Sequence, residues 1–420
     1  MFRQLAIIAS VALSSLPLAA KEISVAPGRL AVALAGADVG DILRLSPGDY
    51  SGPIVIDKAL ALDGGGHATI RGDETGSVIT ITAEDVMVSG MKITGSGSDH
   101  ETIDSGIQLT KTSHRAIIED NVLIGNLYGI DIHGAKDALV KGNVVEGRQD
   151  RLMNRRGNGI YVWNAPGSRV IGNHIRWGRD GIFVNSSKRN VFSENEFHDL
   201  RFAVHYMYAD DSEVSRNLSV NNHLGYAVMF STRVKVIANV SVDDRDHGIM
   251  LNYANRSVIS GNLVRGGPQK CAFLYNSHKN AFENNRFESC GIGIHFTAGS
   301  DRNLITGNAF IGNRTQVKYV ATSWDEWSVD GRGNYWSDFA AYDLNGDGVA
   351  DMPYRPNDSM DHVLWTQPSA KLLLGSPAVQ LVRWSQSAFP ALLPGGVIDS
   401  HALMQPVEIS MPLEPGERSR

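Results

Sequence analysis

An asparagine followed by an apolar residue recurs at a nearly constant interval through most of the chain. The asparagines are Asn121, Asn143, Asn173, Asn195, Asn217, Asn239, Asn262, Asn285 and Asn308. Consecutive steps are 22 or 23 residues, except for one step of 30 that contains the charged stretch 148–156. About eight residues after each asparagine, a small residue such as Gly129, Gly181 or Ala203 begins a second column. A fixed period of this length predicts a solenoid, in which each unit stacks on the next.

The repeating unit reads as strand and turn. Its short alternating runs are broken by Gly, Asn and Asp, and no run has the 3.6-residue periodicity of a long helix. The Leu-x-x-Leu-x-Leu pattern of leucine-rich repeats is missing. We therefore predict an all-β fold, a right-handed parallel β-helix over residues 21–320, with about ten to twelve coils of three short strands. Asparagines in successive coils are expected to bond one another across about 4.8 Å.

Composition narrows the class of protein. The 420 residues carry a formal net charge of −6, which argues against nucleic acid as a partner. Hydrophobic residues make up 42% of the chain, so a large core can form and overall disorder is excluded. Two cysteines, Cys271 and Cys290, can form at most one disulfide, and the sequence leaves open whether they pair.

The N-terminus has the three parts of a secretory signal. Arg3 precedes an apolar run from Leu5 to Leu16, and two small residues come before Lys21. We predict that residues 1–20 are a signal peptide and that the mature chain is exported. A retained membrane anchor is the alternative, although the run is short for a bilayer span.

Alternation along the second column assigns its side chains to two faces, because successive side chains of a strand point to opposite sides. The pairs predicted to face the core are Ile130/Ile132, Ile160/Val162, Ile182/Val184, Val204/Tyr206, Tyr226/Val228, Ile249/Leu251, Phe273/Tyr275 and Ile294/Phe296. The pairs predicted to face outward, here named the outer stripe, are Asp131/His133, Tyr161/Trp163, Phe183/Asn185, His205/Met207, Ala227/Met229, Met250/Asn252, Leu274/Asn276 and His295/Thr297.

The outer stripe is rich in aromatic residues and methionine, and contiguous exposed apolar surface marks contact sites. We predict a docking or ligand-binding surface that includes Tyr161, Trp163 and Phe183. The alternative is a small satellite core covered by a loop or by the C-terminal segment.

One group in the outer stripe has the chemistry of a soft-metal site. Met229 follows Met207 by one period, which predicts adjacent thioethers, and His205 and Met250 share the same face. Thioethers with imidazole favour Cu(I) over zinc or calcium, so we predict transient copper binding by these four residues. The alternative is that methionine serves as adaptable packing at a protein contact.

The sequence also offers an enzymatic interpretation as an alternative to metal binding. The run from Tyr128 to His133 resembles the catalytic stretch of mannuronan epimerases, with Asp131 and His133 placed to abstract and donate a proton. The alternative function is therefore a secreted polysaccharide lyase or epimerase of the β-helix type. Neighbouring outward positions offer no cationic residue to neutralise a substrate carboxylate, which counts against it.

The period fails after Asn308. Aromatic residues at Trp324, Trp327, Tyr335 and Trp336 predict a cap over the end of the solenoid, within residues 321–360. The cap contains a loop like those that bind calcium. Its predicted oxygen ligands are Asp343, Asn345, Asp347 and Asp351. Tyr354 stands where an EF-hand has glutamate, so the alternative is an Asx-rich turn that bonds its own backbone.

Residues 361–405 change pattern again. Helical spacing over 370–374 and 378–384, interrupted by Pro377 and ended by 392–396, predicts two short amphipathic helices. We predict that this segment docks, either on the side of the solenoid or into a membrane partner. Residues 406–420 are expected to be a disordered tail.

Four runs of this sequence together resemble one family. They are Gly157-Asn158-Gly159-Ile160-Tyr161-Val162-Trp163-Asn164, Arg201-Phe202-Ala203-Val204-His205-Tyr206-Met207-Tyr208, Gly331-Arg332-Gly333-Asn334-Tyr335-Trp336-Ser337-Asp338 and Leu372-Leu373-Leu374-Gly375-Ser376-Pro377-Ala378-Val379-Gln380. With these runs the chain resembles the NosD proteins, which take part in the maturation of nitrous oxide reductase.

The resemblance implies a non-catalytic periplasmic subunit that sits on a membrane permease driven by a cytoplasmic ATPase. It also implies metal-transfer work on the copper-sulfur centre of nitrous oxide reductase, with a copper-chaperone lipoprotein as a further partner. It supplies no ligand set, and it leaves open whether copper, sulfur or both are carried.

Overall fold

The asparagine ladder is the most regular feature of the fold. In the computed structural model, the backbone N–H and the side-chain N–H of Asn121 both donate to Oδ1 of Asn143, at 3.0 and 3.1 Å. The same pair of bonds joins each ladder asparagine to the next, as far as Asn308, which donates to Asn334. Every member is at most 1% exposed. Because an unpaired buried amide is costly, this continuous bonding holds neighbouring coils in one register.

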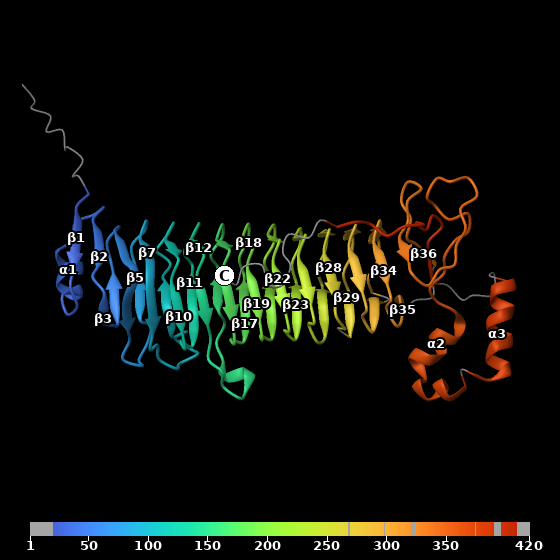
Figure 1. Cartoon of the computed structure of the whole chain (residues 1–420), viewed down its shortest axis with the longest axis horizontal. Helices are drawn as coiled ribbons and strands as arrows, with labels where there is room; N and C mark the ends of the chain where they lie inside the picture. Colours follow the sequence, from blue (N-terminus) through green and yellow to red (C-terminus); the bar gives the residue numbers. More distant parts are fainter. Residues whose placement is uncertain are drawn as a thin grey trace, which may run out of the picture.

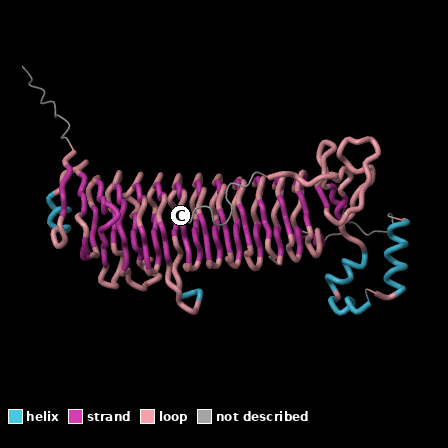
Figure 2. The backbone as a smooth tube through the Cα atoms, viewed as in Figure 1, coloured by secondary structure: helices cyan, strands magenta, loops and turns pink. Residues whose placement is uncertain are grey.

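The structure describes residues 20–267, 269–297, 299–320, 324–373, 375–389 and 396–409. The predicted signal peptide lies outside these residues except for its last position. Within them, the parallel strands form a solenoid of about 13 coils, seen edge-on in Figure 1 and as a stack of strands in Figure 2. The predicted parallel β-helix is therefore confirmed, with slightly more coils than the period indicated.

Three sheets run along the solenoid, and each central coil contributes one strand to each of them. Sheet 1 comprises β4 (Ile54–Ile56), β6 (Ile79–Ile81), β8 (Ser105–Leu109), β11 (Tyr128–His133), β14 (Ile160–Trp163), β17 (Asp180–Asn185), β20 (Phe202–Met207), β23 (Leu224–Met229), β26 (His247–Asn252), β29 (Lys270–Tyr275), β32 (Ile292–Thr297) and β35 (Val317–Val320). Sheet 2 comprises β9 (Ile117–Glu119), β12 (Leu139–Lys141), β15 (Arg169–Ile171), β18 (Val191–Ser193), β21 (Glu213–Ser215), β24 (Lys235–Ile237), β27 (Val258–Ser260), β30 (Ala281–Glu283) and β33 (Leu304–Thr306).

The strands of sheet 2 end just before each ladder asparagine, and the strands of sheet 3 begin just after it. Sheet 3 comprises β10 (Val122–Ile124), β13 (Val144–Glu146), β16 (His174–Arg176), β19 (Glu196–His198), β22 (Leu218–Val220), β25 (Val240–Val242), β28 (Leu263–Arg265), β31 (Arg286–Glu288), β34 (Ala309–Ile311) and β37 (Tyr335–Trp336). The N-terminal coils join sheets 2 and 3 through β1 (Glu22–Val25), β2 (Ile42–Leu45), β3 (Gly48–Ser51), β5 (Ala61–Arg71) and β7 (Met87–Thr94).

The predicted alternation in sheet 1 is confirmed in all but one coil. Inward residues such as Ile182 and Val204 are fully buried, and they pair with each other in register between β17 and β20. The coil of β29 is the exception. Its buried residue is Leu274, and Phe273 and Tyr275 face outward, so the expected order there was wrong by one position.

The error in this coil arises because two small residues stand side by side. Cys271, which forms a disulfide with Cys290, fills the position that glycine takes in neighbouring coils. Ala272 is then the first inward residue after it, in register with Ile249.

Both ends of the solenoid are covered. At the N-terminal end, α1 (Leu30–Gly36) packs Leu30 and Leu34 against the core, an element that the sequence did not predict (Figure 1). At the other end, the indole of Trp336 stacks on Phe310 at a centroid distance of 4.5 Å, and Trp327 is fully buried beside it. The aromatic cap is thus present, although Trp324 is 46% exposed and contributes little to it.

The last described residues complete the cap. β38 (Gly396–Ile398) pairs with β36 (Trp324–Glu326), and buried Asp399 accepts hydrogen bonds from the indole of Trp336 and the backbone N–H of Asn334. Residues 396–405, which the sequence assigned to the helical segment, therefore belong to the cap. Ile409 packs on an apolar patch of sheet 3, so the first part of the expected tail runs back along the solenoid; residues 410–420 lie outside the described residues.

Between the two cap segments lie α2 (Ser359–Thr366), the 3-10 helix η2 (Pro368–Leu373) and α3 (Pro377–Ala388). The two predicted helical stretches correspond to η2 and α3, and α2 was missed. Pro377 begins α3 behind the N-cap Ser376 rather than interrupting a helix. The predicted end of the element at 392–396 lies mostly outside the described residues. No helix in the described part of the chain has the length and apolarity needed to cross a bilayer.

Candidate functional site

The outer face of sheet 1 carries two columns of side chains in strict register. The first column reads Asp131, Tyr161, Phe183, His205, Ala227, Met250, Phe273, His295 and Lys318. The second column reads His133, Trp163, Asn185, Met207, Met229, Asn252 and Tyr275. The four residues proposed for copper therefore occupy three successive coils, β20, β23 and β26.

His205 is held by a buried carboxylate. Its Nδ1 lies 3.2 Å from Oδ2 of Asp180, whose carboxylate also accepts two hydrogen bonds from Arg201, at 2.6 and 2.7 Å. Burial alone would raise the pKa of Asp180, but its bonds with His205 and Arg201 bring this pKa below the ordinary value. The carboxylate is therefore ionised at neutral pH and fixes the imidazole with Nδ1 as the donor.

The other ring nitrogen of His205 is available. Its Nε2 is buried and has no hydrogen-bond partner in the protein, and the residue is 8% exposed. An imidazole that donates one N–H to a carboxylate and keeps the other nitrogen unprotonated has the arrangement found at metal-ligating histidines. Sequence reasoning missed Asp180 and Arg201, because Asp180 is the first residue of β17 and Arg201 immediately precedes β20, ahead of the alternating positions that were assigned to faces.

The methionines lie close to this nitrogen in sequence and register. Met207 and Met229 are direct Cα partners between β20 and β23, and both are half-buried, as is Met250 one coil further on. Ala227 separates His205 from Met250 in the first column. Among the described residues no group of three or more His, Cys, Asp or Glu side chains could hold a metal, so a metal on this face would need the thioethers.

The three predicted docking residues lie on the outer face of sheet 1, and one of them contacts His205 directly. The rings of Tyr161 and Phe183 stack at a centroid distance of 5.4 Å, and Phe183 contacts the His205 imidazole at 4.8 Å. Trp163 stacks on His133 at 4.3 Å in the second column. All three are half-buried, so the stripe presents ring edges to solvent while its faces pack along the solenoid axis.

The N-terminal end of the stripe is closed. Asp131 is fully buried, and its Oδ2 accepts a bond of 3.3 Å from Gln108 while Oδ1 has no partner in the protein. Burial raises the pKa of Asp131 to about 7. Nearby, His100 and the hydroxyl of Tyr128 lie 3.2 Å apart.

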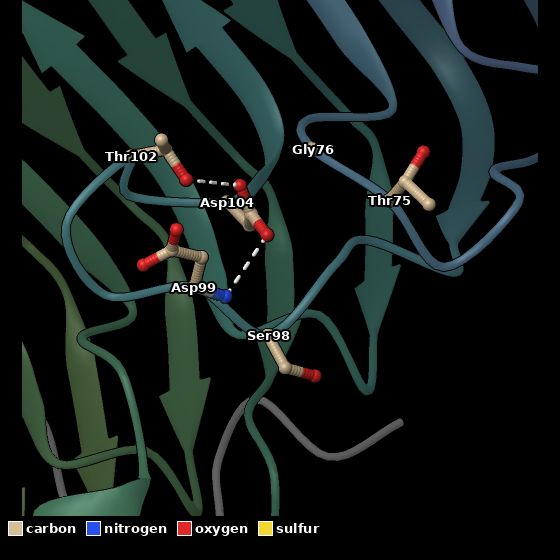
Figure 3. A pocket seen from close by; sticks show the side chains of 6 residues that line it. All are labelled: Thr75, Gly76, Ser98, Asp99, Thr102 and Asp104. Carbon is tan, nitrogen blue, oxygen red and sulfur yellow. Dashed lines mark hydrogen bonds between the residues drawn. The ribbon is translucent and has the colours of Figure 1, made fainter.

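A surface depression of about 670 Å³ lies between the loops that contain residues 75–76 and 98–104. It is lined by Thr75, Gly76, Ser98, Asp99, Thr102 and Asp104 (Figure 3). Its most buried carboxylate, Asp104, accepts bonds from the hydroxyl of Thr102 and the backbone N–H of Asp99. These bonds occupy both of its oxygens with the loop's own donors, so the depression offers little to a ligand.

An exposed aromatic ladder borders the methionines, and it was not identified from the sequence. Tyr208 stacks on Phe230 at 5.3 Å, Phe230 stacks on Tyr253 at 5.2 Å, and Tyr275 lies 5.9 Å further on. The first three adopt positive φ of 50 to 53° in the turn after each strand, where other coils have Asn164, Ser186 and Asn276. The signal was present, because these aromatic residues recur at steps of 22 or 23 residues.

The side chains of the predicted calcium loop accept hydrogen bonds from the loop's own backbone. Asp343 accepts from the backbone N–H groups of Gly346 and Gly348, Asn345 accepts from Asp347, and Asp347 accepts from Val349. The carboxylates do not converge as a metal site in the described residues. These contacts fit the alternative interpretation as an Asx-rich turn, and they do not support calcium.

Comparison with known proteins gives the family. The family model described as "Periplasmic copper-binding protein (NosD)" matches residues 143–341. A probable ABC transporter binding protein NosD from Stutzerimonas stutzeri is 39% identical over 376 residues, 86% of each chain. The protein of the same name from Pseudomonas aeruginosa is 40% identical over 382 residues, 86% of this chain and 87% of that one.

Among solved structures, the Dettilon tailspike protein matches with a TM-score of 0.54 at 16% identity, over 70% of this chain and 64% of the tailspike. That likeness shows the fold alone. Fold and site together define a parallel β-helix protein with a continuous stripe of aromatic, imidazole and thioether side chains along one face. The extended identity to the two relatives shows that the chain belongs to the NosD family.

Proposed function

We propose that this chain is a non-catalytic periplasmic subunit that binds Cu(I) transiently on the outer stripe while associated with an ABC-type membrane complex. Its copper, with or without sulfur, would pass toward the copper-sulfur centre of nitrous oxide reductase. The membrane permease with its cytoplasmic ATPase, the reductase and a copper-chaperone lipoprotein are the proposed partners.

The single observation that carries the proposal is the buried Asp180–His205 pair on the strand face that also carries Met207, whose Cα partner in the next coil is Met229. An oriented imidazole nitrogen is a good copper ligand, and thioethers select the soft monovalent ion. The family description as a periplasmic copper-binding protein supports the same ion. Half-exposed methionines also suit a cargo site, because bound copper must leave for the next protein.

Cu(I) titration of the mature protein against a competing chelator tests this site. Replacing both Met207 and Met229 with leucine keeps volume and apolar character nearly constant, so we expect the melting temperature to change little while Cu(I) affinity falls at least tenfold. The matched control replaces Met153 and Met352, which lie off the stripe, and should bind copper as the unaltered protein does.

Co-purification of the double variant with the transporter complex distinguishes the remaining interpretations. Loss of copper with the complex intact supports cargo handling. Copper binding that persists while the complex dissociates would make the stripe a docking surface and contradict the ligand assignment. If neither property changes, the stripe is a satellite core.

The helical segment supplies the proposed docking element for the membrane complex. Leu372 on η2, Leu381 on α3 and Phe389 just after α3 are 92%, 63% and 60% exposed, which is unusual for apolar side chains in water. The names of the relatives, ABC transporter binding proteins, support this association. Changing Leu372 and Leu381 to asparagine should abolish co-purification with the permease, whereas Leu344→Asn in the cap, at a residue 84% exposed, should not.

The alternative of a polysaccharide lyase or epimerase is not favoured by the site. Asp131, one of the two residues proposed to transfer protons, is fully buried and would not reach a substrate. His133 packs on Trp163 with its Nδ1 3.9 Å from Oδ2 of Asp131, and no lysine or arginine forms an ion pair with Asp131 in the described residues. Turnover of a uronate polysaccharide by the purified chain would overturn the non-catalytic assignment.

A further inference from the structure

The C-terminal end of the outer face of sheet 1 carries a group of cationic and imidazole side chains that neither the copper proposal nor the cap explains. We call His247, Lys270, His295 and Lys318 the cationic cluster. They come from four successive strands, β26, β29, β32 and β35, and His295 pairs in register with Lys318 on one side and Phe273 on the other.

A single aromatic ring organises the cluster. The ring of Phe273 contacts the imidazole of His247 at a centroid distance of 5.2 Å and that of His295 at 5.0 Å. The ammonium of Lys270 lies 3.9 Å from the centroid of the same ring. The ammonium of Lys318 lies 5.9 Å from the centroid of the Trp365 ring in α2, so the cluster approaches the helical segment at this residue.

The positive charge of the cluster is not neutralised. Neither lysine forms an ion pair with a carboxylate in the described residues. The carboxylate of Asp246 acts on Lys270 and His247 through its charge only as a minor cause, and it accepts a hydrogen bond from Gln269 at 3.3 Å and lies 4.0 Å from His223. Two half-buried lysines without an ion-paired carboxylate, on strands β29 and β35 of the same face, are electrostatically unfavourable unless an anion joins them.

The two imidazoles of the cluster also have hydrogen-bonding atoms that a bound anion could satisfy. The Nδ1 atoms of His247 and His295 are both buried and have no hydrogen-bond partner in the protein. Burial, followed by the charges of Lys270 and Lys318, lowers the pKa of His295 to about 3, so this ring is neutral in the empty cluster. A buried ring nitrogen without a partner costs free energy that a ligand can recover.

We propose that the cationic cluster is a binding site for a small, weakly hydrated anion, held between Lys270 and Lys318 against the ring of Phe273, with the imidazoles of His247 and His295 as hydrogen-bond partners. The backbone N–H groups here are used by sheet 1, so the site lacks the array of amide donors with which phosphate-binding loops replace the hydration shell of a strongly hydrated oxyanion. Its floor of Phe273, with Met250 one coil away, favours an anion that loses water easily.

Calorimetric titration of the full mature protein with thiocyanate and with phosphate at low ionic strength tests the site and its chemical class. We expect saturable thiocyanate binding and no phosphate binding, with the affinity weakened by added salt. Lys270→Gln and Lys318→Gln should each weaken thiocyanate at least tenfold, because a charge-assisted contact is removed.

Two controls keep the result interpretable. Lys279→Gln removes the same charge from an exposed turn of the same coil and should leave binding unchanged. Lys318→Arg retains the charge and should bind within a few-fold of the unaltered protein, which separates a charge effect from a folding defect. Absence of saturable binding, or equal losses in Lys279→Gln and Lys270→Gln, would overturn the site. Phosphate binding in place of thiocyanate would overturn the class of anion.

Discussion

The two faces of sheet 1 are formed by the same strands but differ in the kind of side chain that they bury. On the inner face, Ile182, Val204 and Leu251 are fully buried aliphatic residues that contact their counterparts in the next coil. On the outer face, buried polar atoms without a protein partner recur. They are Oδ1 of Asp131, Nε2 of His205, Nδ1 of His247, Oδ1 of Asn252 and Nδ1 of His295.

This contrast separates stability from function in a solenoid. The inner column and the asparagine ladder make every coil stable in the same way, so they carry no information about position along the axis. Unsatisfied polar atoms cost free energy, and their concentration on one face indicates selection for binding rather than for folding. The outer face of sheet 1 also changes along its length, from a buried carboxylate through imidazole and thioether side chains to cationic groups.

Placing a charge on the inner face should give the largest effect. Ile182→Asp buries an unpaired carboxylate and is expected to cost about 4 kcal/mol or more, enough to lower the melting temperature severely or to prevent folding. Asn185→Asp, on the outer face of the same strand, should cost less than about 1 kcal/mol. Similar losses in the two variants, measured by thermal unfolding, would show that the face assignment is wrong.

The buried carboxylate at the closed end of the stripe gives the next largest effect, and one that depends on pH. The pKa of Asp131 is raised by burial to about 7, so the folded protein holds this proton to higher pH than the unfolded chain does. Stability should therefore fall as pH rises from about 4 to about 7, by an amount on the order of 1.4 kcal/mol for each unit of pKa shift, and then level off.

Replacing this carboxyl sharpens the contrast between the faces. Asp131→Asn should raise the melting temperature at pH 8, with the gain disappearing below pH 4. A variant that is less stable than the unaltered protein at pH 8 would mean that the ionised carboxylate is a structural group.

Removing the carboxylate behind His205 should affect copper more than folding. Asp180→Asn weakens the orientation of the imidazole, and loss of such a supporting group costs about 10- to 100-fold in metal affinity. Because the pKa of Asp180 is lowered in the fold, the stability it contributes is present above its unfolded pKa and is lost only as pH falls into the acid range. Asp211→Asn, which breaks an exposed Arg233 pair with no histidine, is the matched control and should leave Cu(I) affinity unchanged.

Some of this organisation could be predicted from the sequence, and the reason is repetition. The ladder and the inner column recur often enough that period and alternation identify them, and the register of Met207 with Met229 follows directly. At Cys271 the same reasoning was wrong by one residue, because two small residues stand together and the pattern does not distinguish them.

What could not be predicted depends on contacts between different positions of the repeat. Asp180 contacts His205 from the start of strand β17 in the preceding coil, a separation of 25 residues that no alternation rule contains. Lys318 joins the cationic cluster from a strand beyond the point where the period fails. The short helix α1 has too few residues to show a helical period. Asp399 contacts Trp336 and Asn334 in the cap, although the whole helical segment separates it from them in the sequence.

The aromatic ladder should show the smallest effect, and it tests whether the outer turns contribute to folding at all. Phe230 is 38% exposed and adopts a left-handed conformation, with φ of 50°, that asparagine tolerates better. Phe230→Asn removes two ring stacks worth about 0.5 to 1.5 kcal/mol each and relieves backbone strain on the order of 1 kcal/mol. The two terms oppose each other, so we expect the free energy of unfolding to change by no more than about 1 kcal/mol. Phe230→Val, which loses the same stacks and keeps the strain with a β-branched residue, should be clearly less stable than Phe230→Asn in thermal unfolding. If both variants lose stability equally and severely, the ladder is part of the structural core.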